Sequence, residues 1–267
     1  IMKLLISNLA WNFDENKKFL ALFKKNKIKN LEFAPSLLFQ NNFKNKNLIN
    51  TKKFWNNKGV RLYSMQSILY GINNCFIFGD NKQRSNFIKE VFKKIDLAKK
   101  LGVKIIVFGS PINKHKFKKK KYLLDKIFIN TFRKIALYTN KKKIYFCLEA
   151  NPKIYKSEYL NYTNEALKVV KIINNKYLMI NLDLGTIIQN KESIDNLINQ
   201  NIKYIKHVQI SVPYLVNVLK HKKKIKELIK LLKFNKYKNN VSIEMSRPKK
   251  NTYQTVKKTI TYINNLF

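Results

Sequence analysis

The sequence predicts a (β/α)8 barrel, the TIM-barrel fold, formed as a single α/β domain over residues 1–267. Short apolar runs with the length of buried strands alternate eight times with segments whose apolar residues recur at helical spacing. No composition break divides the chain, and its length suits one large domain. Such alternation implies parallel strands, and eight repeats at this length favour a closed barrel. An open doubly wound sheet is the competitor, but the glycine-rich turn of a dinucleotide-binding fold is absent after the first strand.

The first half of the chain supplies five of the expected strands. They cover residues 2–10, 28–34, 60–66, 103–109 and 144–148. Helices are expected at 14–26, at 84–101 and from the end of a basic tract (114–121) to about residue 140. Gly102 is the expected C-terminal cap of the second of these helices. Residues 35–57 look less regular, and residues 67–80 look like a long loop that covers something.

The second half supplies the remaining three strands, expected at 177–183, 202–211 and 241–246. Helices are expected at 161–174, 191–200, 215–234 and 252–267. Thr163 or Asn164 is the expected cap of the first of these helices.

The charge balance is strongly basic, with a formal net charge of +40. Only four of the 55 basic residues are arginines, whereas proteins that read nucleic acids rely on arginine for bidentate and stacking contacts. We therefore interpret the lysines as solvated helix faces and expect no specific nucleic-acid partner. No run of about 20 apolar residues predicts a membrane span, and the N-terminus reads as a strand rather than a signal peptide. Cys75 and Cys147 form no CxxC pair, which suggests reduced thiols and a cytoplasmic setting.

Three expected strands end on a carboxylate, although the chain has only 15 acidic residues. Glu149 follows the strand at 144–148, Asp183 ends the strand at 177–183, and Glu244 lies near the end of the strand at 241–246. A buried strand needs no charge at its carboxyl end in order to fold. Because all strand ends of a barrel meet at one mouth, these three acids predict one shared acidic site.

Carboxylates that face one another in a partly dehydrated pocket repel, and they take up protons or a cation. Hard oxygen ligands suit Mn²⁺ or Mg²⁺, and Zn²⁺ stays open. A fourth ligand is expected from the strand at 202–211, where His207 and Gln209 share a face. A histidine in that position is as often a core residue as a ligand.

At this point the chain resembles the xylose isomerase-like TIM-barrel superfamily of sugar phosphate isomerases and epimerases, which also contains endonuclease IV. The resemblance spans essentially the whole chain and rests on eight segments in the expected order. They are ISNLAWNFDEN, LEFAP, YSMQSILYG, VFGSP, LEANP, DLGT, QISVPYL and VSIEM. By position, the resemblance implies that the metal ligands are Glu149, Asp183, Gln209 and Glu244.

Three positions depart from the family pattern. The family carries a metal-binding histidine where this chain has Gln209, and an acid where it has Val212. A histidine found in many epimerases three residues after the strand-six aspartate is Thr186 here. A glutamine oxygen binds Mn²⁺ or Mg²⁺ but is a poorer ligand for zinc.

The resemblance implies proton transfer beside a carbonyl through an enediolate, with Glu149 and Glu244 as the catalytic acids. The substrate would be a sugar or a sugar phosphate, and homo-oligomerisation is left open. Lys114, Lys116 and Arg247 are candidates to hold a phosphate, although solvated lysines are the simpler interpretation of the first two. The full set of expected substrate contacts is Trp11, Glu32, Gln66, Ser110, Asn151, Tyr155, His207 and Arg247.

Two other functions compete with the isomerase or epimerase. A non-catalytic sugar-binding barrel that has lost its metal site is supported by Gln209 and Val212. An endonuclease IV-like nuclease needs a histidine-rich metal cluster, which three histidines do not supply.

Overall fold

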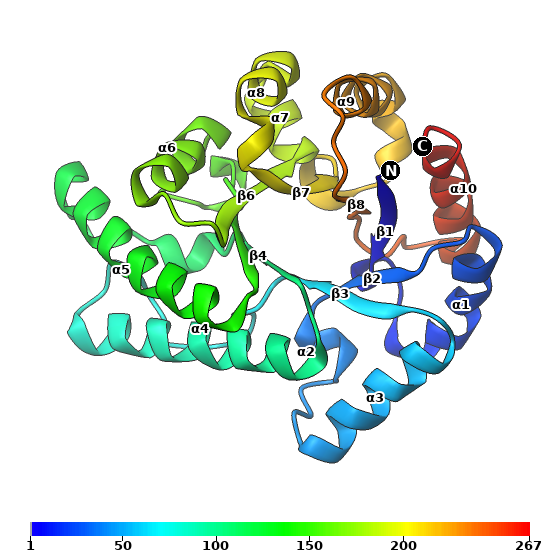
Figure 1. The fold of residues 1–267 in the computed structure, drawn as a ribbon, viewed down its shortest axis with the longest axis horizontal. Coiled ribbons are helices and arrows are strands. Elements are labelled where there is room, and N and C mark those ends of the chain that lie inside the picture. Colours follow the sequence, from blue (N-terminus) through cyan, green and yellow to red (C-terminus); the bar gives the residue numbers. More distant parts are fainter. Residues whose placement is uncertain (1) are drawn as a thin grey trace.

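A computed structural model describes residues 2–267 and contains a closed barrel of eight parallel strands in the order β1 to β8, with β8 pairing back onto β1 (Figure 1). The predicted fold is therefore confirmed. The strands are β1 (Lys3–Ser7), β2 (Asn30–Phe33), β3 (Arg61–Met65), β4 (Ile105–Phe108), β5 (Tyr145–Leu148), β6 (Leu178–Asp183), β7 (Ile205–Ile210) and β8 (Asn240–Ile243).

Helices surround the barrel on the outside, and Figure 1 looks along the barrel with the strands at its centre. The α-helices are α1 (Asn16–Lys25), α2 (Pro35–Leu38), α3 (Asn45–Asn57), α4 (Asn81–Leu101), α5 (Lys121–Lys142), α6 (Thr163–Ile173), α7 (Leu184–Asn190), α8 (Ile194–Asn201), α9 (Lys222–Phe234) and α10 (Thr252–Asn264).

The apolar core has two parts. The larger part lies between the outer faces of the strands and the helices. A small cluster of Ile105, Val107 and Cys147 fills part of the barrel interior, with Tyr63, Tyr145 and Met179 packed against it. Side chains alternate along a strand, so Tyr145 and Cys147 lead directly to Glu149 on the same inward face. The alternation of side chains along β5 therefore places the carboxylate of Glu149 at the mouth of the barrel.

Two irregularities in strand pairing occur where polar residues enter the interior. The pairing of β2 with β3 shifts between Leu31 and Glu32, and the pairing of β6 with β7 shifts between Ile180 and Asn181. A bulge re-aims the side chains that follow it. Glu32 and Asn181 are both buried after their shifts.

Several helices differ from their predicted extents. Residues 45–57 form the regular helix α3, and residues 184–190 form α7, neither of which was predicted. Asp183 caps α7 with a carboxylate oxygen that accepts from the backbone N–H of Thr186. The predicted helix at 215–234 begins only at Lys222, because short 3-10 turns occupy its first part. Tyr162, rather than Thr163 or Asn164, occupies the cap position of α6.

The predicted strand at 2–10 ends at Ser7, and the predicted helix at 14–26 begins at Asn16, because 3-10 turns occupy residues 8–10 and 13–15. The predictions for Gly102 and for the two cysteines are confirmed. Gly102 ends α4 with a φ of 82°, in the left-handed region that favours glycine. Both cysteines are buried free thiols. None of the helices in residues 2–267 combines the length and apolarity that a membrane span requires.

Candidate active site

A cavity of about 580 Å³ opens at the carboxyl ends of the strands. Its polar floor contains Glu149, Asp183 and Glu244, which the sequence predicted to share a site. Its walls come largely from the loops that follow β3 and β4. The lining residues on those loops are Ser67, Leu69, Tyr70, Gly71, Ile72, Asn73, Gly109, Ser110, Pro111, Ile112 and Asn113. The loop predicted at 67–80 therefore does cover the mouth of the barrel.

Glu149 is held at both of its carboxylate oxygens by side-chain amides. Oε1 accepts from Asn151 Nδ2 and Oε2 accepts from Asn181 Nδ2, each at 2.8 Å. Burial, together with the negative charge of Asp183, raises the pKa of Glu149 to about 8, although the two amides and Lys114 oppose the shift. A carboxyl group with such a pKa exchanges its proton near neutral pH.

Asp183 ends β6 and is bound on both oxygens as well. Oδ2 accepts from the backbone N–H of Thr186 at 2.7 Å and from its hydroxyl at 3.0 Å, while Oδ1 accepts from the Ser211 hydroxyl. Burial raises the pKa of Asp183 above its usual value, and these hydrogen bonds act against the rise. Thr186 is thus a donor to Asp183 through both its backbone N–H and its hydroxyl.

Glu244 follows β8 and is 8% exposed. Burial raises its pKa well above the usual value, and the charges of Glu149, Asp183 and Glu32 add to the rise. The neighbouring carboxylates thus add to the effect of burial on Glu244.

Gln209 belongs to a buried polar network beneath the cavity rather than to its wall. Its Nε2 donates to Glu32 Oε1 at 2.9 Å, and its Oε1 accepts from Asn181 Nδ2 at 2.5 Å. Glu32 also accepts from Ser64 Oγ at 2.7 Å and lies 2.6 Å from His207 Nε2. Burial alone would raise the pKa of Glu32, but His207, Gln209 and Ser64 together lower it.

The oxygen chemistry of the cavity floor suits a hard divalent cation, because Glu149, Asp183 and Glu244 present only carboxylate oxygens. The predicted convergence on one ion-sized point is not formed: within residues 2–267, no three histidine, cysteine or acidic side chains come close enough together to hold an ion. Amide and hydroxyl donors occupy the oxygens of Glu149 and Asp183 instead. The side-chain oxygen of Gln209 is directed to Asn181, so its role as a ligand stays a prediction.

Four of the eight predicted substrate contacts line the cavity, namely Gln66, Ser110, Asn151 and Tyr155. Gln66 donates to the Ser7 hydroxyl at 2.6 Å. Ser110 has a φ of 46°, which is uncommon for a residue other than glycine. Tyr155 accepts from the backbone N–H of Tyr214 at 2.8 Å, which ties the loop after β7 to the loop after β5.

The other four predicted contacts lie outside the cavity wall. Trp11 is packed in the core, where it stacks on Phe19 and donates to Asn16. Arg247 is bonded to Glu15 at 3.3 Å. Glu32 and His207 are fully buried in the barrel interior, so their positions give them no direct contact with a ligand in the cavity.

Lys114 differs most from its predicted environment. The sequence placed it in a solvated basic tract, but it is 1% exposed and its Nζ donates to Asn151 Oδ1 at 2.9 Å. Lys116, two residues further, is exposed as expected. Sequence reasoning also passed over Asn181, although two-residue alternation puts it on the same face as Asp183.

Gly109 lines the cavity at a point where a side chain would not fit. A Cβ atom there would lie 2.7 Å from both Asn151 Nδ2 and Glu149 Oε1. The glycine therefore leaves room for the contact between Glu149 and Asn151.

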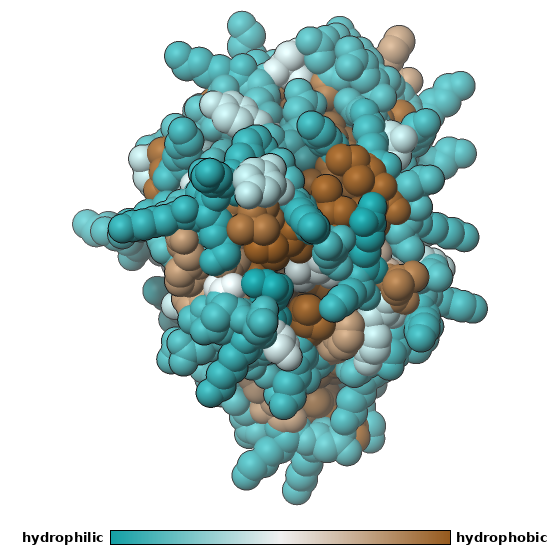
Figure 2. Space-filling view, turned by 90° about the vertical axis from the view of Figure 1, so that its left-hand side faces the viewer, coloured by the Kyte–Doolittle hydropathy of each residue, from teal (hydrophilic) through white to brown (hydrophobic). Residues whose placement is uncertain are grey.

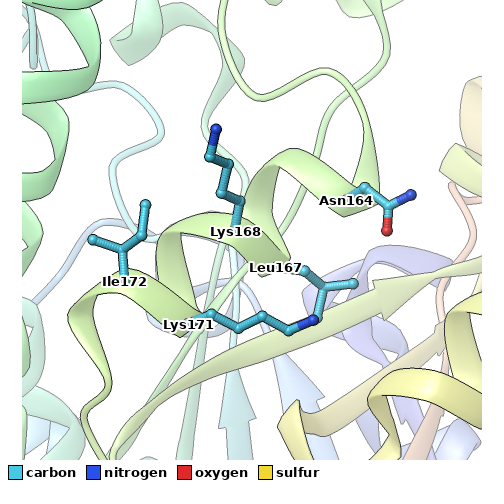
Figure 3. A pocket seen from close by; sticks show the side chains of 5 residues that line it. All are labelled: Asn164, Leu167, Lys168, Lys171 and Ile172. Carbon is cyan, nitrogen blue, oxygen red and sulfur yellow. The ribbon is translucent and has the colours of Figure 1, made fainter.

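A second hollow, of about 430 Å³, lies along α6 and is lined by Asn164, Leu167, Lys168, Lys171 and Ile172 (Figure 3). Lys168 and Lys171 point in different directions there, and Lys171 is already bonded to Asn201. This hollow contains no acidic residue and none of the predicted site residues, so the barrel mouth is the candidate active site.

Comparison with known proteins agrees with the architecture. A family model described as xylose isomerase-like TIM barrel matches residues 20–266. No protein with a curated function matches the chain. The 3-keto-D-glucoside 4-epimerase of E. coli superposes with a TM-score of 0.80 at 15% identity, covering 99% of this chain and 100% of that chain.

Two further solved structures are similar over the whole chain. The D-psicose 3-epimerase of Clostridium cellulolyticum H10, solved with D-tagatose, has a TM-score of 0.78 at 18% identity and covers 99% of this chain and 96% of that chain. The protein IolI with a bound zinc atom has a TM-score of 0.74 at 18% identity and covers 100% of this chain and 99% of that chain. At these identities the likeness establishes the shared fold.

Proposed function

Because the chain belongs to the xylose isomerase-like TIM-barrel family, we propose that it is a sugar isomerase or epimerase that acts on an uncharged sugar. One observation carries this proposal: Glu149, Asp183 and Glu244 line one cavity at the barrel mouth, and burial raises the pKa of each. Glu149, with a pKa of about 8, holds and releases a proton near neutral pH, as proton transfer beside a carbonyl requires.

Glu149 and Glu244 are the proposed proton carriers. Glu149 follows β5 and Glu244 follows β8, so they approach the cavity from different sides of the barrel. One removes the proton from the carbon next to the carbonyl, which gives an enediolate, and the other returns it to the opposite face. Two acids used in this way invert a stereocentre, whereas one acid that moves the proton between adjacent carbons interconverts an aldose and a ketose.

A divalent ion, with Mn²⁺ or Mg²⁺ favoured, would be held by Glu149, Asp183 and Glu244. When bound, it would supply positive charge beside the carbonyl oxygen on which negative charge develops. Gln209 remains the predicted fourth ligand through its side-chain oxygen. The similarity to a structure with a bound zinc atom supports a metal site in this fold without selecting the metal.

The lining of the cavity favours an uncharged sugar over a sugar phosphate. No lysine or arginine of the described chain lines it, although the protein has 55 basic residues. A phosphate dianion would lie beside carboxylates with no direct cationic partner. The apolar walls, which include Leu69, Ile72 and Leu215, suit the carbon face of a sugar.

The experiment is deuterium exchange from D₂O into a panel of free ketoses and ketose phosphates, with Mn²⁺ or Mg²⁺ present. We expect exchange at the carbon beside the carbonyl of at least one free ketose. Glu244→Gln should lower that exchange at least about 10³-fold, because an essential acid or base is lost. A melting curve checks that the variant remains folded. Exchange into phosphorylated sugars alone would contradict the proposed substrate class.

A non-catalytic sugar-binding barrel is the second candidate. The observation that favours it is that Gln209 Oε1, the predicted fourth ligand atom, already accepts a hydrogen bond from Asn181. Calorimetric binding of a ketose without any exchange would support this second function. The nuclease alternative gains no support, since His115 lies at the surface beside Glu158 and His207 lies inside the barrel.

A further inference from the structure

Lys114 lies at the end of a 3-10 turn (Pro111–Lys114) in the loop after β4. Among residues 2–267 it is the one lysine or arginine that is fully buried. Burying an amine is costly, since it loses its hydration, so a lysine is retained in such a place only where something offsets that loss. The apolar core of the barrel does not need this charge.

The contacts of Lys114 lead directly to the cavity floor. Its Nζ donates to Asn151 Oδ1 at 2.9 Å, and Asn151 Nδ2 donates to Glu149 Oε1 at 2.8 Å. A protonated amine can only donate, so it fixes which end of the Asn151 amide faces it. The NH₂ group of Asn151 is thereby aimed at Glu149.

The charges around Lys114 are consistent with this arrangement. Glu149 and Glu165 are the carboxylates whose charge favours its protonated form, and burial lowers its pKa to about 7. In return, Lys114 opposes the rise in the pKa of Glu149. Lys114 does not itself line the cavity, so it is not placed to bind a substrate.

We propose that Lys114 is a positioning residue of the active site: through Asn151 it holds the carboxyl group of Glu149 in place. Its consequence for catalysis rests on the proposed function, whereas the coupling of Lys114 to Glu149 does not. The two parts are therefore tested separately.

The first test is a double-mutant cycle in urea unfolding at neutral pH. Lys114→Met is measured in the natural chain and in Glu149→Gln. We expect the loss in unfolding midpoint to be at least about twice as large with Glu149 present, because contacting residues are non-additive. Lys116→Met is the matched control and should shift the midpoint equally in both backgrounds. If Lys114→Met does not fold, Lys114→Gln completes the cycle.

The second test measures deuterium exchange into the ketose that the natural protein accepts. Lys114→Met should lower kcat at least about tenfold and change KM less than about threefold, since the proton carrier is displaced while the cavity wall is kept. Lys116→Met should leave both unchanged.

Equal midpoint losses in the two backgrounds would overturn the proposal, whatever the activity. Unequal losses with an unchanged kcat would overturn the positioning role. Unequal losses in a protein that exchanges no ketose would refute the proposed function, while the coupling of Lys114 to Glu149 would stand.

Discussion

The two amides that bond to Glu149 are each held by a further neighbour: Lys114 donates to Asn151, and Asn181 also donates to Gln209. Lys114 faces the oxygen of Asn151, and Glu32 accepts from Nε2 of Gln209, whose oxygen in turn faces Asn181. An amide can be flipped without changing its shape, but neighbours that only donate or only accept allow one orientation. The carboxylate of Glu149 is thus fixed from two directions.

Gln209→His should raise the affinity for Zn²⁺ at least about tenfold and leave the fold intact. One ring nitrogen can keep the hydrogen bond to Glu32, and the other is then presented toward the site as a ligand. Zinc titration of the natural protein and the variant, each followed by a melting curve, measures the effect. An unchanged zinc affinity in a folded variant would show that position 209 does not reach the ion.

Gly109→Ala should lower ketose exchange at least about tenfold, because its Cβ would displace the pair formed by Glu149 and Asn151. The stability cost should be small, on the order of 1 kcal/mol, since both neighbours are side chains at the edge of a cavity. Exchange rates and urea unfolding measure the two effects. Full activity in the variant would mean that the contact between Glu149 and Asn151 is dispensable.

At this scale the sequence predicts the acidic floor better than its surroundings. Glu149, Asp183 and Glu244 stand out because a carboxylate at the end of a buried strand is unusual. Lys114 could not be recognised, because its neighbours 116 and 118–121 are also lysines and only the turn after Pro111 directs it inward. The orientation of Gln209 depends on Glu32, which is 177 residues away along the chain.

For helices and strands, the spacing of apolar residues and the length of the apolar segment determine what can be predicted. The strands are short apolar runs, and the sequence predicts all eight because parallel strands that are buried on both faces consist of such runs. Helix α3 was missed because it buries only Leu48 and Trp55 and is otherwise rich in lysine and asparagine. Helix α7 was missed because its cap, Asp183, was read only as a site residue.

Asp80→Ala should destabilise the protein by about 1 kcal/mol without changing activity. Asp80 Oδ1 accepts from the backbone N–H of Gln83 at 2.8 Å, and Gln83 Oε1 accepts from the backbone N–H of Asp80 at 3.0 Å. Asp80→Asn retains an acceptor and is the control. Urea unfolding of the three proteins measures the difference. Equal losses in the alanine and asparagine variants would rule out the capping interaction as the cause.

For the molecule as a whole, the lysines form a hydrophilic surface around the barrel. Figure 2 shows this for one face, where protruding hydrophilic side chains surround small apolar patches near the centre. The high net charge is therefore carried on the outside, whereas no lysine or arginine among residues 2–267 lines the cavity. Basic groups thus dominate the surface, whereas the ionisable groups of the cavity floor are acids.

The metal-free protein should lose stability as pH rises from about 5 to 7. Folding raises the pKa of Glu149 to about 8 and also raises those of Asp183 and Glu244. The folded state thus binds protons more tightly than the unfolded state does. The stability that this adds is fully present below the unfolded-state pKa values and is lost as pH rises toward the folded-state pKa values. Lys114, whose pKa is lowered, acts in the opposite direction only above about pH 7.

Melting temperatures at pH 5 and pH 7, measured with a chelator, test this expectation. We expect the free energy of unfolding of the natural protein to fall by on the order of 1 kcal/mol between these two pH values, after allowance for the partial exposure of Glu149, and its melting temperature to fall accordingly. The double variant Glu149→Gln, Glu244→Gln should lose less. A steeper loss in that variant would place the pH dependence outside the cavity.

The pairing of β1 with β8, which closes the barrel, has a consequence for the rates of folding and unfolding. Glu244 follows β8, the last strand of the chain, so this carboxylate reaches the other two only when β8 joins its neighbours β7 and β1. A partly assembled barrel that lacks β8 does not yet carry the full repulsion among the acids. The repulsion thus arises late, when the barrel closes. It therefore increases the rate of barrel opening more than it lowers the rate of the earlier folding steps. A cation or ligand that neutralises the acids would accordingly act chiefly by lengthening the lifetime of the closed barrel.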